Sequence, residues 1–325
     1  MKSDADNEWA DLVITGGTVH TMDPRHRISE AVAVTGDRIT RVGPSREVAA
    51  LIGPGTRVVH LEGRSLLPGI NDSHLHATWL GHRWPHLLLT PSDNPTALLT
   101  PPENPPEDPV AETQGRLSGT AEWRAAILRA GELLSPLGIT SYTEPGLGPG
   151  EDDGETGCFG AGVLAEYAKL AEEGLLRARV TALMLFGELD GPSTLEALLD
   201  GLEHYKPPED VPGRFKTAGV KIFADGIPPM RTAWSDEPYA DGTHSAPLVR
   251  PSTALPAMIK AAAARGHQVA VHATGSRATR TAAHALAEAP ANRHYLIHGD
   301  VLHPETVDVM ARGSCSCCPA RCGTG

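Results

Sequence analysis

The sequence contains no run of about 18 uninterrupted apolar residues, which is the length that a membrane-spanning helix requires. Its polar, acidic start also lacks the basic and apolar segments of a secretion signal. Positive charge is in deficit too, because the 325 residues carry a formal net charge of -12. Nucleic-acid phosphates and anionic membranes repel an acidic surface, so we expect neither as a partner. These absences predict a cytoplasmic globular protein that acts on a small-molecule substrate, and they leave a homo-oligomer open.

Cysteine is scarce through most of the chain. Cys158 stands alone, and the other four crowd into the last eleven residues, at Cys315, Cys317, Cys318 and Cys322. No disulfide framework spans the body of the chain, which suits a reducing compartment. The spacing in the tail does not match the paired Cys-x2-Cys hairpins of zinc sites. Two interpretations of the tail stay open: a small metal or redox site, or a segment read out of frame in place of the true C-terminus.

Residues 1–64 predict a small N-terminal β domain. Four short segments there are rich in β-branched residues and are separated by Gly, Asp and Pro turn signals. The expected strands are 11–15, 31–35, 38–42 and 57–61.

Residues 65–312 follow an α/β pattern, in which short apolar strands alternate with helices. The expected strands are 66–76, 138–143, 179–186, 219–224, 267–273 and 294–299. Helical periodicity is clearest at 121–134, 162–173, 194–205, 253–265 and 277–289. Six consecutive strand–helix units favour a TIM-like (β/α) barrel, with about six of its eight units present, over an open sheet. The Cys-rich tail, 313–325, falls outside the pattern.

Two segments interrupt this pattern. Residues 91–110 hold seven prolines, which disfavour helix and central strand, and we expect a surface loop. Residues 227–251 are irregular and follow the fourth strand, on the face where such barrels keep their active sites. This second segment is a candidate substrate lid, in which Trp234, Tyr239 and His244 could line a pocket.

The strongest chemical signal is the pair His74 and His76, which ends an apolar strand segment. Side chains two residues apart lie on the same face of a strand, so both rings could bind one metal ion. His272 and His298 each end a later strand of the expected barrel. Because the carboxyl ends of barrel strands meet at one face, the four histidines predict a metal centre there.

Lys221 is the fifth candidate residue. Strand alternation points it away from Val220 and Ile222 and therefore into the barrel. A buried lysine is costly unless it is neutralised or converted. In a two-metal site its amine could react with carbon dioxide to give a carbamate that bridges both ions. Alternatively, its ammonium could pair with Asp225 while its stem packs in the sheet.

Five motifs carry a family resemblance. They are DLVITGGTV at 11–19, LPGINDSHLH at 67–76, VKIFADG at 220–226, VHATGSRA at 271–278 and RHYLIHGD at 293–300. Together they resemble the amidohydrolase superfamily, specifically the YtcJ-like group (amidohydrolase family 3), whose members include N-substituted formamide deformylases. The resemblance runs from about residue 10 to residue 305.

The resemblance implies a metal-dependent hydrolase that cleaves a carbon–nitrogen bond of the amide type by metal-activated water. By this likeness His74 and His76 hold the first metal ion, a carboxylated Lys221 bridges, and His272 and His298 hold the second. Zinc is the expected cofactor, as one or two divalent ions. Lys221 and His298 are also expected to take part in catalysis. The small β domain corresponds to the composite sandwich of the superfamily.

One residue that the resemblance implies is not found. In the family mechanism an aspartate at the end of the eighth barrel strand acts as ligand and general base. After His298 only a helix at 304–312 and the Cys-rich tail follow. Asp225 and Asp300 are the carboxylates nearest to the expected ligands, and each is expected to support its neighbours rather than to replace the base. We therefore expect a chain truncated at its C-terminus.

Two alternatives to an active hydrolase stay open. The first is a truncated, catalytically impaired paralogue that binds metal without turnover. The second is a metal-dependent nuclease of the TatD type, which also uses a His-x-His pair. The N-terminal β domain and the lack of basic patches disfavour the nuclease.

Overall fold

The computed structural model describes residues 9–84, 115–189, 191–250, 252–290, 292–312 and 316–318. The chain forms two compact units, Met1–Ile70 and Asn71–Gly325. The expected proline-rich loop at 91–110 lies outside the described residues. None of the helices in the described part of the chain has both the length and the apolar character to span a membrane.

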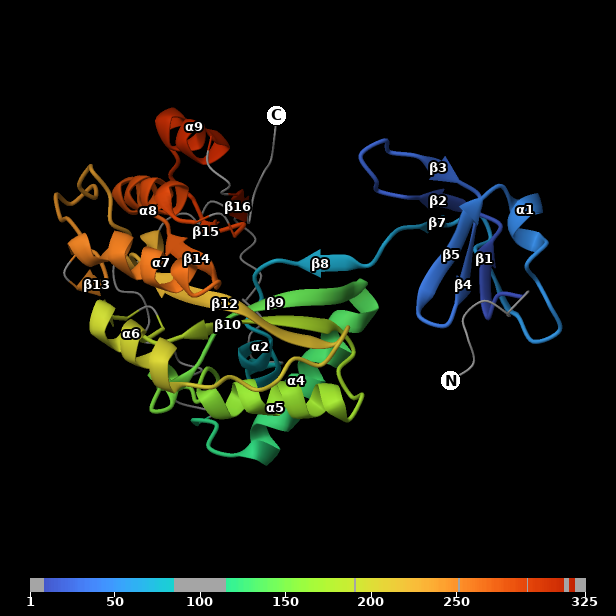
Figure 1. The fold of residues 1–325 in the computed structure, drawn as a ribbon, viewed down its shortest axis with the longest axis horizontal. Helices are drawn as coiled ribbons and strands as arrows, with labels where there is room; N and C mark the ends of the chain where they lie inside the picture. Colours follow the sequence, from blue (N-terminus) through green and yellow to red (C-terminus); the bar gives the residue numbers. More distant parts are fainter. Residues whose placement is uncertain are drawn as a thin grey trace. The chain divides into compact units, whose positions relative to one another are not determined.

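The first unit contains two small sheets and one short helix (Figure 1). The four-stranded sheet has the order β5-β4-β1-β6, which are Arg38–Gly43, Ala31–Thr35, Leu12–Thr15 and Arg57–His60. The three-stranded sheet has the order β3-β2-β7, which are Ile28–Ser29, Thr18–His20 and Ser65–Leu66. Val13, Ala31 and Ala33 are buried together with Val48 of helix α1 (Ser45–Ala49). The sandwich arrangement and the domain limits at residues 64 and 312 remain predictions.

The second unit is built on a seven-stranded sheet with the order β16-β15-β14-β12-β10-β9-β8 (Figure 1). The strands are β8 (Ile70–Asp72), β9 (Ile139–Leu147), β10 (Arg179–Leu185), β12 (Phe215–Phe223), β14 (Gln268–Ala273), β15 (Tyr295–His298) and β16 (Ser316–Cys318). All neighbours from β9 to β16 pair in parallel. A parallel sheet with intervening helices agrees with the TIM-like α/β class expected from the sequence.

Helices connect the strands of this sheet. They are α2 (Ala77–Arg83), α4 (Thr120–Leu134), α5 (Ala161–Glu172), α6 (Leu195–His204), α7 (Leu255–Ala264), α8 (Ser276–Glu288) and α9 (Pro304–Arg312). Short 3-10 turns occur at Ser135–Leu137, Pro149–Glu151, Pro228–Met230 and Ser252–Ala254. A separate parallel pair joins β11 (Ser193–Thr194) to β13 (Val249–Arg250).

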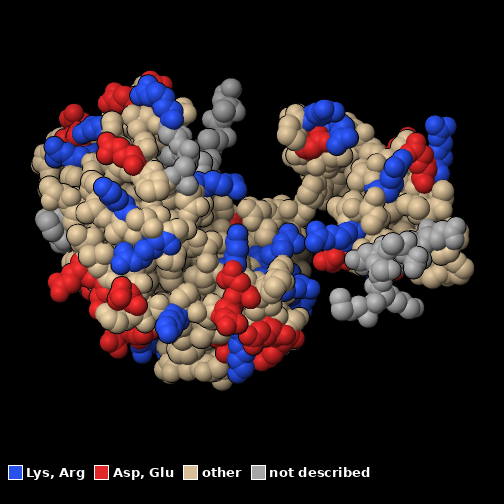
Figure 2. Space-filling model, viewed as in Figure 1, with Lys and Arg blue, Asp and Glu red and all other residues tan. Residues whose placement is uncertain are grey.

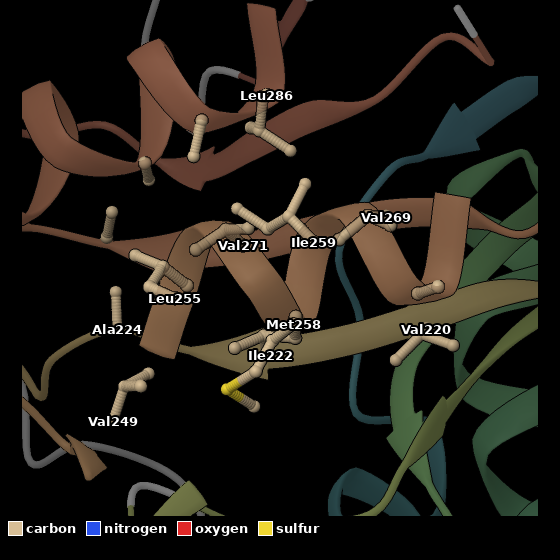
Figure 3. Packing of buried hydrophobic residues seen from close by; sticks show 14 of the residues in the cluster. Val220, Ile222, Ala224, Val249, Leu255, Met258, Ile259, Val269, Val271 and Leu286 are labelled. Atoms are coloured by element: carbon tan, nitrogen blue, oxygen red, sulfur yellow. The ribbon is translucent and has the colours of Figure 1, made fainter. Parts of the chain in front are cut away.

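Side-chain alternation gives the sheet a helix-facing side and an inner side. Val220 and Ile222 of β12 pack with Ile259 of α7 and Leu286 of α8 (Figure 3). A separate buried cluster, formed by residues of the opposite alternation, consists of Leu183, Ala270 and Ile297. Lys221 lies between Val220 and Ile222 and is paired in register with Ala270, so it belongs to the inner side.

Two predictions about the strands were wrong. The Cys-rich tail supplies a seventh strand, β16, in which Cys317 pairs with Leu296 of β15. The first strand ends at Asp72 and not at His76, because the Asp72 carboxylate accepts the His74 amide hydrogen at 3.0 Å and turns the chain. Short polar side chains form such local bonds in competition with strand pairing, and alternation alone does not reveal them.

A buried histidine completes the hydrogen bonding at the start of β14. The Val269 amide donates to Nδ1 of His294 at 2.9 Å, and Nε2 of the same ring bonds to the Pro290 carbonyl at 2.7 Å. Replacing it by alanine leaves that buried amide without its acceptor. We expect His294→Ala to lower the free energy of unfolding by about 1–3 kcal/mol in urea denaturation. His284→Ala, on the exposed side of α8, is the matched control. Equal stabilities of the two variants would contradict this role.

Candidate metal centre

His74 and His76 lie in the turn between β8 and α2 rather than within a strand. The Leu75 amide donates to the Thr143 carbonyl of β9 at 3.0 Å, so the turn remains attached to the sheet. The two imidazole rings meet edge to face, with their centroids 5.1 Å apart. The prediction that His74 and His76 lie on one face of a strand is therefore wrong, although the turn still brings their rings together.

The structure gathers all five predicted side chains in one region of the second unit. The His298 ring centroid lies 4.8 Å from that of His74 and 4.5 Å from that of His272. Lys221 is 2% exposed, and its Nζ lies 4.4 Å from the centre of the Phe223 ring. That phenyl ring in turn lies 4.8 Å from the His272 ring. Residues from β12, β14, β15 and the turn after β8 thus converge.

His298 reaches this group through an unusual backbone conformation. It is the last residue of β15, and its φ of 70° lies in the left-handed region, which non-glycine residues rarely adopt. Ile297 belongs to the inner cluster, so simple alternation would turn the next side chain toward the helices. The turned backbone instead lets the His298 ring contact His74 and His272. Local strain of this kind occurs at functional sites.

Burial and charge favour neutral imidazoles in this group. Burial is the main cause that lowers the pKa of His74 far below its ordinary value, that of His272 to about 2 and that of His298 to about 4. The positive charge of Lys221 lowers all three pKa values further. Neutral imidazole is the form that binds metal ions, so these rings need not lose a proton first.

The hydrogen bonds of the histidine rings also leave ring nitrogens with a lone pair that could bind a metal ion. Nε2 of His272 lies 3.0 Å from the Gly226 carbonyl, which can only accept, so Nδ1 retains a lone pair. Nδ1 of His76 faces a carboxylate oxygen of Glu144 at 3.1 Å, which leaves Nε2. Among the described residues, the buried Nδ1 of His74 has no hydrogen-bond partner.

The side chains are gathered but are not yet arranged as a complete ligand set. Within the described ranges, no three His, Cys, Asp or Glu side chains are placed so that they could hold a metal ion. The chemistry of the donors nevertheless fits a divalent ion such as zinc, because several neutral imidazoles with available nitrogens share one buried region.

Asp225 supports the loops around the centre, as the sequence suggested. It is completely buried and accepts hydrogen bonds from the amides of Trp234, Thr274 and Gly275 at 2.8–3.0 Å and from the Thr274 hydroxyl at 3.2 Å. The segment after β12 is thereby attached to the start of α8. Its role as a substrate lid stays a prediction.

Trp234, Tyr239 and His244, which were expected to line a pocket, each lie in a different local environment. The Arg277 guanidinium lies 5.6 Å from the Trp234 ring centre. The Tyr239 hydroxyl donates to the Ala233 carbonyl at 3.1 Å, and His244 is exposed.

Glu144 is the buried residue that sequence reasoning missed. Its carboxylate contacts His76, and the residue lies within β9, in the stretch Thr-Glu-Pro-Gly. An acidic residue directly after the apolar strand expected at 138–143 was the available signal. Its partners come from distant parts of the chain, so the sequence could not show what it contacts.

Cavities lie at both ends of the sheet. One of about 440 Å³ is lined by residues at the amino ends of β10 and β12, such as Arg179 and Phe215, away from the histidines. Another of about 390 Å³ is lined in part by Phe159, whose ring centroid lies 5.1 Å from that of His76. The five predicted ligand residues line neither of these two cavities, and the second reaches their region only through Phe159.

Comparison with known proteins identifies the family. Residues 87–314 match the family model described as "Amidohydrolase family", and the chain belongs to this family. The match includes Lys221, His272 and His298, whereas His74 and His76 precede it. The resemblance inferred from the sequence is confirmed.

Curated relatives match over shorter segments. The N-substituted formamide deformylase of Arthrobacter pascens is 38% identical over 69 residues, which is 21% of this chain and 13% of that protein. The putative amidohydrolase YtcJ of Bacillus subtilis is 34% identical over 118 residues, 35% of this chain and 22% of that protein. Protein LONG AFTER FAR-RED 3 of Arabidopsis thaliana is 40% identical over 67 residues, 21% of this chain and 12% of that protein. The matches thus span less than a quarter of these relatives' own lengths.

Solved structures agree on the fold. An uncharacterized metal-dependent hydrolase from Pyrococcus horikoshii has a TM-score of 0.65 at 19% identity, covering 92% of this chain and 72% of that one. A second one, from Pyrococcus furiosus, has a TM-score of 0.65 at 21% identity and covers 92% and 74%. At these identities the likeness shows the fold alone.

The buried carboxyl of Asp225 predicts a specific pH dependence of stability. Burial raises its pKa from 3.8 to about 6, although its hydrogen-bond donors act in the opposite direction. The folded state therefore takes up this proton more readily than the unfolded state. This stabilisation is complete below about pH 4 and is lost as the pH rises through about 6, by roughly 2–3 kcal/mol.

Urea denaturation of the wild type and of Asp225→Asn between about pH 4 and pH 7 measures this contribution. The stability of the wild type relative to the variant should fall over that range. Asp210→Asn, at an exposed position, should track the wild type. A constant difference between wild type and Asp225→Asn would contradict the raised pKa.

Proposed function

We propose that this chain carries the metal centre of a hydrolase that cleaves carbon–nitrogen bonds of the amide type. The observation that carries the proposal is the convergence of four histidine rings and Lys221 at the carboxyl ends of parallel strands. Membership of the amidohydrolase family supports hydrolysis as the reaction class. The relatives that match in sequence include an N-substituted formamide deformylase, an adenine deaminase and an imidazolonepropionase.

In this proposal His74 and His76 hold one divalent ion, and His272 and His298 hold a second or complete the first site. Zinc is the first choice, because imidazole nitrogens suit it. A bound divalent ion supplies Lewis-acid chemistry: it lowers the pKa of water and polarises a carbonyl group. The chain's own contribution is to hold neutral imidazoles in a buried region and to exclude bulk water from it.

Lys221 has a distinct role in the proposal. As an ammonium it repels cations and lowers the pKa of His74, His272 and His298. Reaction of its neutral amine with carbon dioxide forms a nitrogen–carbon bond and releases a proton, giving an anionic carbamate. This change replaces a positive charge by a negative one and supplies two oxygen ligands. We therefore propose that Lys221 is carboxylated when the site is loaded.

A small molecule is the proposed substrate. On the face drawn in Figure 2, acidic and basic side chains of the second unit are interspersed. This pattern, with the net charge of -12, favours a small molecule over a nucleic acid.

Zinc binding by the full chain tests the proposed ligands. After equilibrium dialysis, plasma mass spectrometry should find at least one zinc ion per wild-type chain, and His272→Ala should weaken binding by at least about tenfold. His284→Ala serves as the control because that side chain is exposed on α8. The proposal fails if the wild type binds well below one ion per chain.

Bicarbonate dependence tests the carboxylated lysine. Zinc loading of the wild type should be stronger in bicarbonate buffer than in buffer freed of carbon dioxide, because the carbamate forms only from carbon dioxide. Lys221→Ala, which has no amine to form a carbamate, should bind zinc equally in both buffers. Turnover of N-formyl and N-acyl compounds should follow the loading. Equal wild-type loading in both buffers would exclude the carbamate, and loading without turnover would exclude hydrolysis of these compounds.

A further inference from the structure

Glu144 makes three hydrogen bonds from a completely buried position. Its Oε1 lies 3.1 Å from Nδ1 of His76, and its Oε2 accepts the Ala77 amide at 2.8 Å and the Tyr167 hydroxyl at 3.0 Å. The Thr78 hydroxyl donates to the same tyrosine oxygen at 3.0 Å. A buried carboxylate is costly unless such partners satisfy it, so this arrangement has a structural or functional reason.

We propose that Glu144 is a positioning residue for His76, holding its ring orientation and its tautomer for metal binding. A carboxylate without a proton can only accept, so His76 places its proton on Nδ1 and keeps the lone pair on Nε2. The inference rests on the proposed metal centre, and it adds a residue that does not itself bind the ion.

The surroundings of His76 fix the ring from more than one direction. The Phe159 ring stands nearly perpendicular to it, at 84°, with the centroids 5.1 Å apart. Glu144 also binds the amide of Ala77, the next residue, so ring and backbone are held by the same carboxylate. Tyr167 belongs to the apolar cluster of α4 and α5, which anchors the carboxylate to the helix layer.

A purely structural role makes a different prediction from a positioning role. Binding the Ala77 amide at the start of α2 needs only one acceptor oxygen, which glutamine also provides. A side chain that accepts from both the imidazole N–H and that amide needs two acceptor oxygens. Glutamine has only one. When the glutamine oxygen faces Ala77, its NH2 group faces Nδ1 of His76 and favours the tautomer with the proton on Nε2. Glu144→Gln therefore separates the two roles.

The tautomer can be measured in the metal-free full chain. Nitrogen NMR of histidine-labelled protein distinguishes a protonated from an unprotonated Nδ1, and His76→Ala identifies the relevant signals. We expect the wild type to carry the proton on Nδ1 of His76 and Glu144→Gln to shift the population toward Nε2. Zinc affinity, measured with zinc alone in competition with a chromophoric chelator, should fall about 10- to 100-fold in the same variant.

Glu166→Gln is the matched control. Glu166 is also buried, at 3% exposure, but it lies on α5 and pairs with Arg124 at 3.0 Å. Its substitution should leave both the tautomer of His76 and the zinc affinity unchanged. If Glu144→Gln fails to fold, Tyr167→Phe removes one donor to the same carboxylate and should lower zinc affinity roughly two- to tenfold.

The outcomes distinguish this inference from the proposed function. Unchanged tautomer and affinity in Glu144→Gln, with zinc bound normally by the wild type, would overturn the positioning role alone. Equal losses of zinc affinity in Glu144→Gln and Glu166→Gln would show a general effect on the fold and would also overturn it. Failure of the wild type to bind zinc would overturn the proposed metal centre, and the positioning role with it.

Discussion

Parallel pairing of β12, β14 and β15 is the constraint on which the candidate centre depends. It places Phe223 of β12 beside His272, and Ala273 of β14 beside His298. Because parallel strands end at the same edge of a sheet, side chains distant in sequence leave the backbone at a similar height. The apolar helix-facing layer keeps this register, since a shift by one residue would turn Val220 and Ile222 inward and Lys221 outward.

Burying these polar groups close together costs free energy of folding. His298 adopts a left-handed backbone conformation, which costs on the order of 1–3 kcal/mol. Lys221 and His272 are almost fully buried, at 2% and 3% exposure. The cost has a chemical consequence, because burial keeps imidazole rings neutral and therefore able to bind a cation. Glu144 and Asp225 offset part of it by satisfying amides in the turns that carry the histidines and their neighbours.

Much of this arrangement could be predicted from the sequence. The alternation of strands and helices gave the α/β class, and the position of Lys221 between two apolar residues indicated its inward direction. His272 and His298 were found because each ends an apolar strand. Such signals are local and periodic, so a sequence displays them directly.

The remaining features depend on contacts that a sequence does not display. The Asp72 carboxylate ends β8 before the histidine pair, and the backbone of His298 turns against strand alternation. The role of Glu144 depends on its contact with His76, which lies 68 positions away in the sequence. The tail was expected to fall outside the strand–helix pattern, yet Cys317 pairs with Leu296 of β15. Each case is a tertiary contact overriding a local pattern.

Zinc-edge X-ray absorption of the loaded full chain tests the central claim most directly, because it identifies the atoms around the ion. A centre built from the histidines predicts nitrogen and oxygen ligands at about 2.0–2.1 Å, with the outer-shell scattering of imidazole. A shell of sulfur at about 2.3 Å would place the ion on the cysteines of the tail and would contradict the account.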